Sequence, residues 1–447
     1  NIDRILDVAR RSGAQAIHPG YGFLAENTGF VRACGRAGIT FVGPPAEAMD
    51  KVGDKIQSRR TMRAAGVPII PGTTDPVSDP REAANVAAEI GYPVLLKASA
   101  GGGGTGIRVV QDAGEFDRAI ANVRAEAKAA FGDDTVFVEK LLRPARHIEI
   151  QVIADAHGNV VTLGERECSI QRRRQKLIEE SPAPGMTPEL RARMQAAAKS
   201  VVRACDYRNA GTVEFLVYDE TEFAFLEMNA RLQVEHPVTE LVRGVDLVAD
   251  QLRIAAGRPL GYTEADRPSR GWAMECRITA EDPYRDFLPT TGAVAYYREP
   301  AGPGIRVDGM LHPGMEVSVH YDSLLAKLVA WGEDRDECRR RMQRALREFT
   351  VVGVSTSIPF HLAMLSDPRF IAGDISTEYL ETAFRLNAEA RPETTESGAM
   401  AAAAFLWQQG ELAPAAQMRN GRGGGAWAAS ARARRTTPEQ GWRRNST

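Results

Sequence analysis

Cysteine is scarce in this sequence, and the few thiols stand far apart. The 447 residues include 5 cysteines, namely Cys34, Cys168, Cys205, Cys276 and Cys338, and no two of them form a CxxC pair. An odd number of widely separated cysteines provides no disulfide framework and fits a reducing compartment such as the cytoplasm. We therefore expect buried thiols without a chemical role.

Long apolar runs and an excess of charge of one sign are also missing. No run approaches the roughly 18 apolar residues of a membrane helix, and no signal peptide opens the chain. The formal net charge is -2, so there is no basic excess to neutralise phosphates. These absences predict no membrane segment and no nucleic-acid partner. The remaining composition, 43% hydrophobic and 26% charged, is that of a soluble globular protein.

The first 50 residues predict part of an α/β layer. The chain begins with Asn1 rather than a methionine, and residues 1–12 have the pattern of an amphipathic helix. Strand patterns at Ala14–Ile17 and Ile39–Val42 flank a second helix. We expect a parallel sheet that is truncated at its N-terminal side.

A linker and a compact unit should follow. The segment Pro68–Pro80 is rich in Pro, Gly, Thr and Asp, which is typical of a linker. A helix is predicted over Arg81–Ile90, and strands over Val94–Lys97 and Ile107–Val110. Between these two strands lies a glycine-rich turn.

Two later helices have clear signals. Pro188–Cys205 begins after Thr187, a good N-cap, and has proline at its first position. Glu333–Phe349 carries one apolar stripe that we interpret as core. That stripe consists of Cys338, Met342, Ala345, Leu346 and Phe349. Residues 387–447 are rich in Ala, Gly and Arg and predict a flexible tail or linker.

The segment 211–240 contains the strongest chemical signal. It predicts two strands joined at residues 219–222, with Glu214 directly opposite Glu227. Like charges at directly opposed positions repel each other, so this pair indicates a divalent cation between the two carboxylates. Asn229, Arg231, Gln233 and Glu235 follow at every second position, and an extended chain would point them the same way.

A second signal is the glycine-rich loop that follows Lys97. The sequence Gly101–Gly106 contains GxGxxG, but a strand follows it where a dinucleotide-binding fingerprint needs a helix. No GK[ST] closes the loop, so the P-loop pattern also fails. A flexible structural turn is one interpretation. We favour a loop whose backbone N–H groups cover polyphosphate.

Other basic residues give weaker signals. Lys55 and Lys140 are each compatible with ordinary surface lysines, although Glu139 and Lys140 follow a strand where a ligand ring could be recognised. The run Arg172–Lys176 is compatible with a solvated charged face. Its apolar flanks also fit a strand or turn that aims cations into an anion-binding cleft.

Taken together, these motifs resemble the biotin carboxylase family of ATP-grasp enzymes over residues 1–385. The resemblance rests on segments that occur in family order: 18–24 (HPGYGFL), 53–55 (GDK), 97–99 (KAS) with its glycine loop, 146–152 (RHIEIQV), 171–176, 227–229 (EMN), 233–240 (QVEHPVTE) and 275–278 (ECRI). It implies an α/β fold, α+β in part. The implied parts are a truncated Rossmann-like preATP-grasp domain (1–50), an ATP-grasp domain (51–260) with a lid at about 70–140, a C-terminal biotin carboxylase domain (261–385) and a tail (386–447).

The resemblance also implies site residues. Nucleotide contacts would come from Lys55, Lys97, Gly103, Gly104, Glu139, Lys140, Leu141, Leu142 and His147, with Gln171 and Arg174 as further ligand-binding residues. Glu214, Glu227 and Asn229 would hold Mg²⁺ or Mn²⁺, at two sites. Lys176, Arg231, Gln233 and Val234 would bind bicarbonate, with Glu235 as general base and Arg277 facing biotin.

The implied reaction joins ATP, bicarbonate and biotin. Carboxyphosphate would form and break down to CO2 and phosphate, which deprotonates the biotin nitrogen. No Met-Lys-Met carrier motif occurs, so a carrier protein or domain would present the biotin to this chain and to a carboxyltransferase. A homodimer is also implied.

Two departures from the family pattern are Thr105, where Lys or Arg is usual, and Arg174, where histidine is common. Two alternatives remain, namely another ATP-grasp ligase and an impaired fragment that acts only in assembly.

Overall fold

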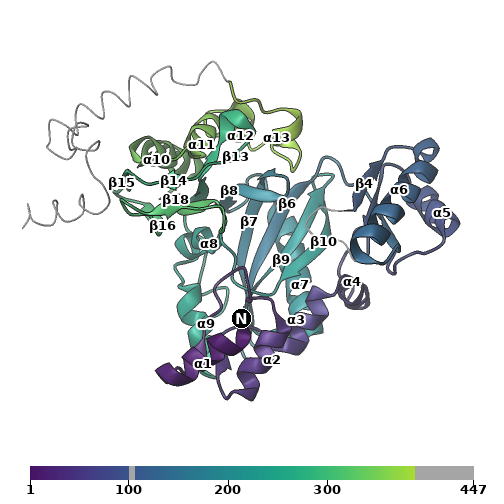
Figure 1. The fold of residues 1–447 in the computed structure, drawn as a ribbon, viewed down its shortest axis with the longest axis horizontal. Helices are drawn as coiled ribbons and strands as arrows, with labels where there is room; N and C mark the ends of the chain where they lie inside the picture. The colour runs from purple at the N-terminus through teal and green to yellow at the C-terminus, as the bar shows by residue number, and fades with distance from the viewer. Residues whose placement is uncertain (100–105, 388–447) are drawn as a thin grey trace, which may run out of the picture. The chain divides into compact units, whose positions relative to one another are not determined.

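The computed structural model describes residues 1–99 and 106–387 (Figure 1). The predicted phosphate-binding residues Gly103 and Gly104, the departure at Thr105 and the predicted tail therefore lie outside the described residues. Within the described part, no helix combines the length and apolarity that a membrane span requires. All 5 cysteines are buried and free, as expected from the sequence.

The N-terminal segment contains a short parallel strand pair covered by helices. Its elements are α1 (Ile2–Ser12), β1 (Ala16–Ile17), α2 (Thr28–Arg36), β2 (Thr40–Phe41), α3 (Ala46–Gly53) and α4 (Lys55–Ala64). β1 pairs with β2 in parallel, as the sequence predicts. α1 begins at an Asn1 cap whose side chain accepts a hydrogen bond from the Arg4 N–H.

The next unit has the predicted helix–strand–strand order. It comprises α5 (Pro80–Ile90), β3 (Val94–Ala98), β4 (Ile107–Val110), α6 (Ala113–Phe131) and β5 (Val136–Lys140). The strands form a 3-stranded sheet in the order β4-β3-β5. Apolar side chains from the sheet, α5 and α6 form a separate small core that includes Val94, Leu96, Phe116 and Val123. We call residues 70–140 the lid segment.

The central region supplies most of one large sheet. Its elements are β6 (Arg146–Ala154), β7 (Val160–Arg172), β8 (Gln175–Ser181), α7 (Pro188–Cys205), β9 (Asn209–Tyr218), β10 (Glu222–Asn229), α8 (His236–Arg243) and α9 (Leu247–Ala255). α7 begins as predicted, because the Thr187 hydroxyl accepts a hydrogen bond from Leu190 N at 3.1 Å. Leu190, Met194, Val201 and Cys205 on this helix pack against the sheet.

The C-terminal region adds short strands and further helices. They are β11 (Trp272–Thr279), β12 (Glu281–Asp282), the 3-10 helix η1 (Pro283–Arg285), β13 (Leu288–Pro289), β14 (Gly292–Ala293), β15 (Tyr296–Arg298), β16 (Ile305–Gly309), β17 (Glu316–Val317), β18 (Leu324–Gly332), α10 (Arg335–Glu348), β19 (Thr350–Val352), α11 (Ile358–Met364), α12 (Pro368–Ala372) and α13 (Tyr379–Thr382). The predicted stripe on α10 is buried in the core at all five positions.

One 8-stranded antiparallel sheet joins the central and C-terminal regions. Its order is β10-β9-β6-β7-β8-β11-β18-β16, and β10, β9, β6 and β7 lie side by side in Figure 1. β8 pairs with β11, so the sheet continues across residue 260. The domain boundaries therefore stay a prediction, because hydrogen bonding does not stop at that position.

The β9–β10 hairpin reaches the predicted pairing by an unexpected route. Glu214 is paired with Glu227, as predicted. The turn, however, has Tyr218 opposite Glu222, and the register shifts between Phe225 and Glu227. A β-bulge therefore replaces the unbroken ladder and the centred turn that we predicted. The bulge also shifts which residues of β10 point to the core. Phe223, Phe225 and Met228 all enter the core, whereas Glu227 pairs with Glu214 on the opposite face of the sheet.

The core role of α10 can be tested with one truncation. Met342 is fully buried, so Met342→Ala should lower the free energy of unfolding by about 2–5 kcal/mol. Arg340 lies on the exposed side and pairs only with Asp336 among the described residues. Arg340→Ala should change stability by less than about 1 kcal/mol. Urea unfolding measures both; equal effects would contradict the packing described here.

Candidate functional site

A row of charged side chains crosses one face of the large sheet. Glu227 on β10 pairs with Glu214 on β9, Glu214 pairs with Glu149 on β6, and Glu149 pairs with Arg166 on β7. Directly paired residues share a face, so three carboxylates follow one another across neighbouring strands. Such a row is stable only where cations balance it.

Lys176 on β8 supplies the central positive charge. Its ammonium donates to Glu149 Oε2 at 2.6 Å, to Glu214 Oε1 at 2.9 Å and to Glu235 Oε1 at 2.6 Å. All three carboxylates are buried. Burial by itself would lower the pKa of Lys176, but these carboxylates outweigh it and raise that pKa well above its usual value. The lysine therefore remains charged and joins three strands and α8 at one point.

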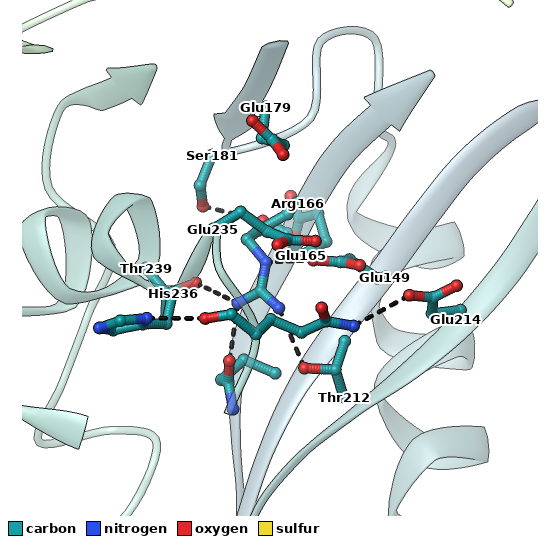
Figure 2. A network of polar contacts seen from close by, with 12 residues as sticks. Glu149, Glu165, Arg166, Glu179, Ser181, Thr212, Glu214, Glu235, His236 and Thr239 are labelled. Carbon is teal, nitrogen blue, oxygen red and sulfur yellow. Dashed lines mark hydrogen bonds and ion pairs between the residues drawn. The ribbon is translucent and has the colours of Figure 1, made fainter. Parts of the chain in front are cut away.

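Arg166 is the second buried cation and is completely enclosed. Its guanidinium donates to Glu149, to Gln151 Oε1 at 2.7 Å, to Thr239 Oγ1 at 3.0 Å and to Thr212 Oγ1 at 3.0 Å. Figure 2 shows this network below Glu235. Every partner is fixed in the sheet or α8, so Arg166 supports the site from beneath and has little freedom to meet a ligand.

Glu235 lies at the start of α8 between two cations. Lys176 binds its Oε1, and Arg277 Nη2 on β11 donates to its Oε2 at 2.9 Å. Burial would raise the pKa of Glu235, but Lys176, Arg277 and Arg166 together lower it well below the usual value. Arg277 Nε also donates to Glu179 Oε1 at 2.6 Å. The predicted base and the residue predicted to face biotin are thus in direct contact.

The predicted metal ligands lie together at the β9–β10 edge. Asn229 Nδ2 donates to Glu214 Oε1 at 2.9 Å. Partial desolvation and then the charge of Glu214 raise the pKa of Glu227, while its side chain stays reachable from solvent. A carboxylate that resists ionisation beside another carboxylate fits a cation-binding pair, and the all-oxygen ligand set suits Mg²⁺ or Mn²⁺. These residues therefore fit the implied metal.

The polar row after β10 also converges, but for a different reason than predicted. β10 ends at Asn229, and no strand continues through Arg231, Gln233 and Glu235. Arg231 instead donates to Asn229 Oδ1 at 2.9 Å and to Gln233 Oε1 at 3.1 Å. Gln233 Nε2 donates in turn to Glu214 Oε1 at 3.0 Å. The expectation of an extended chain is wrong, because this loop bends to bring the groups together. The carbonyl of Val234 accepts from Lys327 Nζ at 3.1 Å.

His147 on β6 is buried beside Glu214. Its Nε2 lies 3.0 Å from Glu214 Oε2. Burial would lower the pKa of His147, but the charge of Glu214 outweighs it and the pKa is raised. Burial would raise the pKa of Glu214, but Lys176 and then His147 outweigh it and lower that pKa. His147 thus lies directly against the row of carboxylates.

The lid residues form a separate cluster. Lys97 on β3 donates to Glu139 on β5, and Arg59 Nη1 donates to the same carboxylate at 2.8 Å. Lys140 Nζ donates to the carbonyls of Gly91 and Tyr92 at 3.0 and 2.9 Å. Its side chain is therefore tied to the lid backbone.

The remaining predicted nucleotide contacts are two leucines that follow the lid segment and one lysine on α4. Leu141 N donates to Pro93 O at 3.1 Å, and Leu142 follows it half-buried. Lys55 begins α4, and its side chain lies outside the description. The nucleotide contacts of all these residues stay predictions.

The basic run is divided between two environments. Arg172 Nη2 donates to Asp286 Oδ1 at 2.5 Å, and Arg173 Nη2 donates to Asp286 Oδ2 at 3.0 Å. Arg174 is exposed in the β7–β8 turn at a φ of 66°. Among the described residues, Lys176 alone of this run contacts the buried row of carboxylates, and binding of an anion by the run stays a prediction. Gln171 pairs with Lys176 at the end of β7.

Sequence reasoning missed several residues of this network. Glu149 and Gln151 lie in the RHIEIQV segment, and their alternation with Ile148 and Ile150 was a usable signal. Arg166 and Glu179 come from strands whose polar residues had no visible pattern. Glu26, from the N-terminal segment, accepts from Arg231 Nε at 2.9 Å. Contacts across 205 positions of sequence leave no local trace.

Three family models match successive parts of the chain. "Biotin carboxylase, N-terminal domain" matches residues 1–49, "Carbamoyl-phosphate synthase L chain, ATP binding domain" matches 54–263, and "Biotin carboxylase C-terminal domain" matches 275–382.

Similar proteins of known name and structure agree with these models. A pyruvate carboxylase subunit of Methanothermobacter thermautotrophicus is 52% identical over 400 residues, which cover 89% of this chain and 81% of that protein. Biotin carboxylase 1 of Bacillus subtilis is 49% identical over 383 residues, covering 86% and 85%.

A solved structure gives the same result. The biotin carboxylase domain dimer of Hydrogenobacter thermophilus 2-oxoglutarate carboxylase, in complex with MgADP, ADP and bicarbonate, matches with a TM-score of 0.80 and 46% identity. The match covers 85% of this chain and 84% of that one. The chain belongs to the biotin carboxylase family, with an ATP-grasp fold.

Proposed function

We propose that this chain uses ATP and bicarbonate to carboxylate carrier-bound biotin through carboxyphosphate. It is an ATP-dependent enzyme of the biotin carboxylase family; the assignment of steps to residues is our inference. The observation that carries it is the contact of Glu235 with both Lys176 and Arg277. One carboxylate thereby links an anion-binding lysine with the arginine assigned to biotin.

Glu235 would act as the base that activates bicarbonate. Lys176, Arg231 and Gln233 would supply donors that suit a small planar anion, because hydrogen bonds through Gln233 and Glu214 bring the three side chains together. A bound anion would draw the positive charge of Lys176 away from Glu235. The pKa of Glu235 would then rise toward the range in which a carboxylate accepts a proton at neutral pH.

Glu214, Glu227 and Asn229 would hold the metal and thereby the ATP phosphates. Bound Mg²⁺ or Mn²⁺ neutralises charge that develops on the transferred phosphoryl group. Lys97 would add a second positive charge from the lid. For this, Lys97 must leave Glu139, and Arg59 would remain to neutralise that carboxylate.

Arg277 would stabilise the enolate form of the biotin ring. Its guanidinium is held by Glu179 and Glu235, so its direction is fixed before biotin arrives. The biotin would be carried by a separate protein or domain that also visits a carboxyltransferase, and we propose a homodimer as the working state. The relatives include subunits of pyruvate and propionyl-CoA carboxylases, so the final acceptor can be an acyl-CoA or a 2-oxo acid.

Free biotin separates the proposed function from its alternatives. Bicarbonate-dependent ATP hydrolysis by the purified chain should increase when free biotin is added, and carboxybiotin should form. Another ATP-grasp ligase would hydrolyse ATP with no response to biotin. A chain that binds ATP but shows no bicarbonate-dependent hydrolysis would support a role in assembly only.

The base can be removed without changing the size of the side chain. Glu235→Gln should lower bicarbonate-dependent ATP hydrolysis by about 10²–10⁴-fold, the usual contribution of a general base. ATP binding should persist, because the lid contacts do not involve Glu235. A Glu235→Gln chain that keeps its thermal unfolding temperature and also its rate would contradict the assignment.

The metal pair has its own test. Glu227→Gln should raise the Mg²⁺ concentration needed for half-maximal activity by roughly tenfold or more, because one anionic ligand is lost. Glu222→Gln is the matched control, since Glu222 is an exposed residue at the far end of the same strand. Activity titrations with Mg²⁺ and Mn²⁺ measure both. Identical metal dependence in the two variants would overturn the site.

A further inference from the structure

Behind Arg277 lies a pair of buried carboxyl groups that the proposed reaction does not use. Glu275 on β11 is paired directly with Glu179 on β8. Both residues are 0% exposed. Directly paired side chains in an antiparallel ladder have Cβ atoms about 5 Å apart, so two glutamates here are within reach of each other.

Three of the four carboxyl oxygens of this pair accept no hydrogen bond from the described residues. Glu179 Oε1 accepts from Arg277 Nε at 2.6 Å. No donor group from the described part of the chain reaches Glu179 Oε2 or either oxygen of Glu275. An ionised carboxylate left without hydrogen bonds in the interior is very costly, so a charged Glu275 is untenable here.

The neighbouring charged groups do not supply the missing partner. Lys327 on β18 donates to Val234 O at 3.1 Å and pairs with Asp308 Oδ2 at 3.2 Å. Arg277, on the same strand as Glu275, is directed to Glu179 and Glu235. Glu235 itself adds a further negative charge. The charges facing Glu275 from β8, β18, its own strand and α8 are therefore either committed elsewhere or repulsive.

We propose that Glu275 is a neutral carboxylic acid whose O–H donates a hydrogen bond to Glu179 Oε2. This hydrogen bond fixes the orientation of Glu179 toward Arg277. One proton satisfies the orphaned oxygen of Glu179 and removes the second negative charge from the interior. Glu275 is then a positioning residue that acts through Glu179 on Arg277. This rests on the role proposed above for Arg277.

The burial and the pairing favour the protonated form, and the backbone contacts of Arg277 support the positioning role. Burial and the neighbouring Glu179 raise the pKa of Glu275 well above its usual value, and burial raises that of Glu179 to about 7. The backbone of Arg277 is also held rigidly. Its carbonyl accepts from Ser357 Oγ at 2.9 Å, and His361 Nε2 lies 2.7 Å from it. With the backbone fixed, the orientation of Glu179 sets, together with Glu235, where the guanidinium points.

Infrared spectroscopy can detect the proton without any turnover. The wild-type chain should show the C=O stretch of a protonated carboxylic acid at pH 8, and Glu275→Gln should remove it. Glu165→Gln is the control, because Glu165 is also buried but is bound by Arg191 at 2.8 Å; the band should persist there. Absence of the band in wild type, or its persistence in Glu275→Gln, would overturn the proposal.

Activity of two variants tests the positioning role. Glutamine is neutral and can donate to Glu179, so Glu275→Gln should keep kcat within about threefold of wild type. Methionine has similar size but no donor, so Glu275→Met should lower the biotin-stimulated kcat roughly tenfold or more with little change in the KM for ATP. A Glu275→Gln chain that fails to fold or loses activity like Glu275→Met would show that the ionised carboxylate is required.

The two proposals can fail separately. If the wild-type chain shows the infrared band but no response to biotin, the proposed function fails and the protonated pair stands. If biotin stimulates ATP hydrolysis by the wild type but the band is absent, the proposed function stands and Glu275 is not protonated.

Discussion

The ammonium of Lys176 is the contact on which the site depends. It binds carboxylates from β6, β9 and the start of α8 at 2.6–2.9 Å in a buried setting. Three carboxylates this close together repel one another, and the ammonium offsets that repulsion at their centre. The lysine therefore allows the sheet to carry a row of buried negative charge, and such a row is suited to balance a divalent cation.

Burying these charged groups lowers the free energy of unfolding, but it fixes the positions of the side chains. Removing two opposite charges from water is expensive, and an apolar core of the same size would often be at least as stable. Each carboxylate here has a second partner that limits its freedom: Arg166 for Glu149, Asn229 for Glu214 and Arg277 for Glu235. These side chains consequently have few accessible conformations before a ligand binds. Little reorganisation is left for the moment of reaction.

Local pattern predicted the elements well and the site only where its residues lie close in sequence. The helix at Pro188–Cys205 and the stripe on α10 follow from caps and periodicity. The Glu214–Glu227 pair follows from a hairpin. Arg166 and Glu179 were beyond such reasoning, since their partners lie on other strands that reach them only through the order of the sheet. The assigned chemistry came from resemblance, because side-chain spacing does not identify a substrate.

The bulge in β10 has a consequence for how this hairpin can change. A three-residue turn with a bulge and a four-residue turn without one use the same number of residues and give the same Glu214–Glu227 pair. Only the bulged form also sends both Phe225 and Met228 inward. On β10, the alternation of core-facing and opposite-facing side chains therefore shifts by one residue between Phe225 and Glu227. Point substitutions on either side of the bulge leave this alternation unchanged. Inserting or deleting a single residue at the bulge would instead turn the side chains on one side of it from the core to the face that carries Glu227, or the reverse.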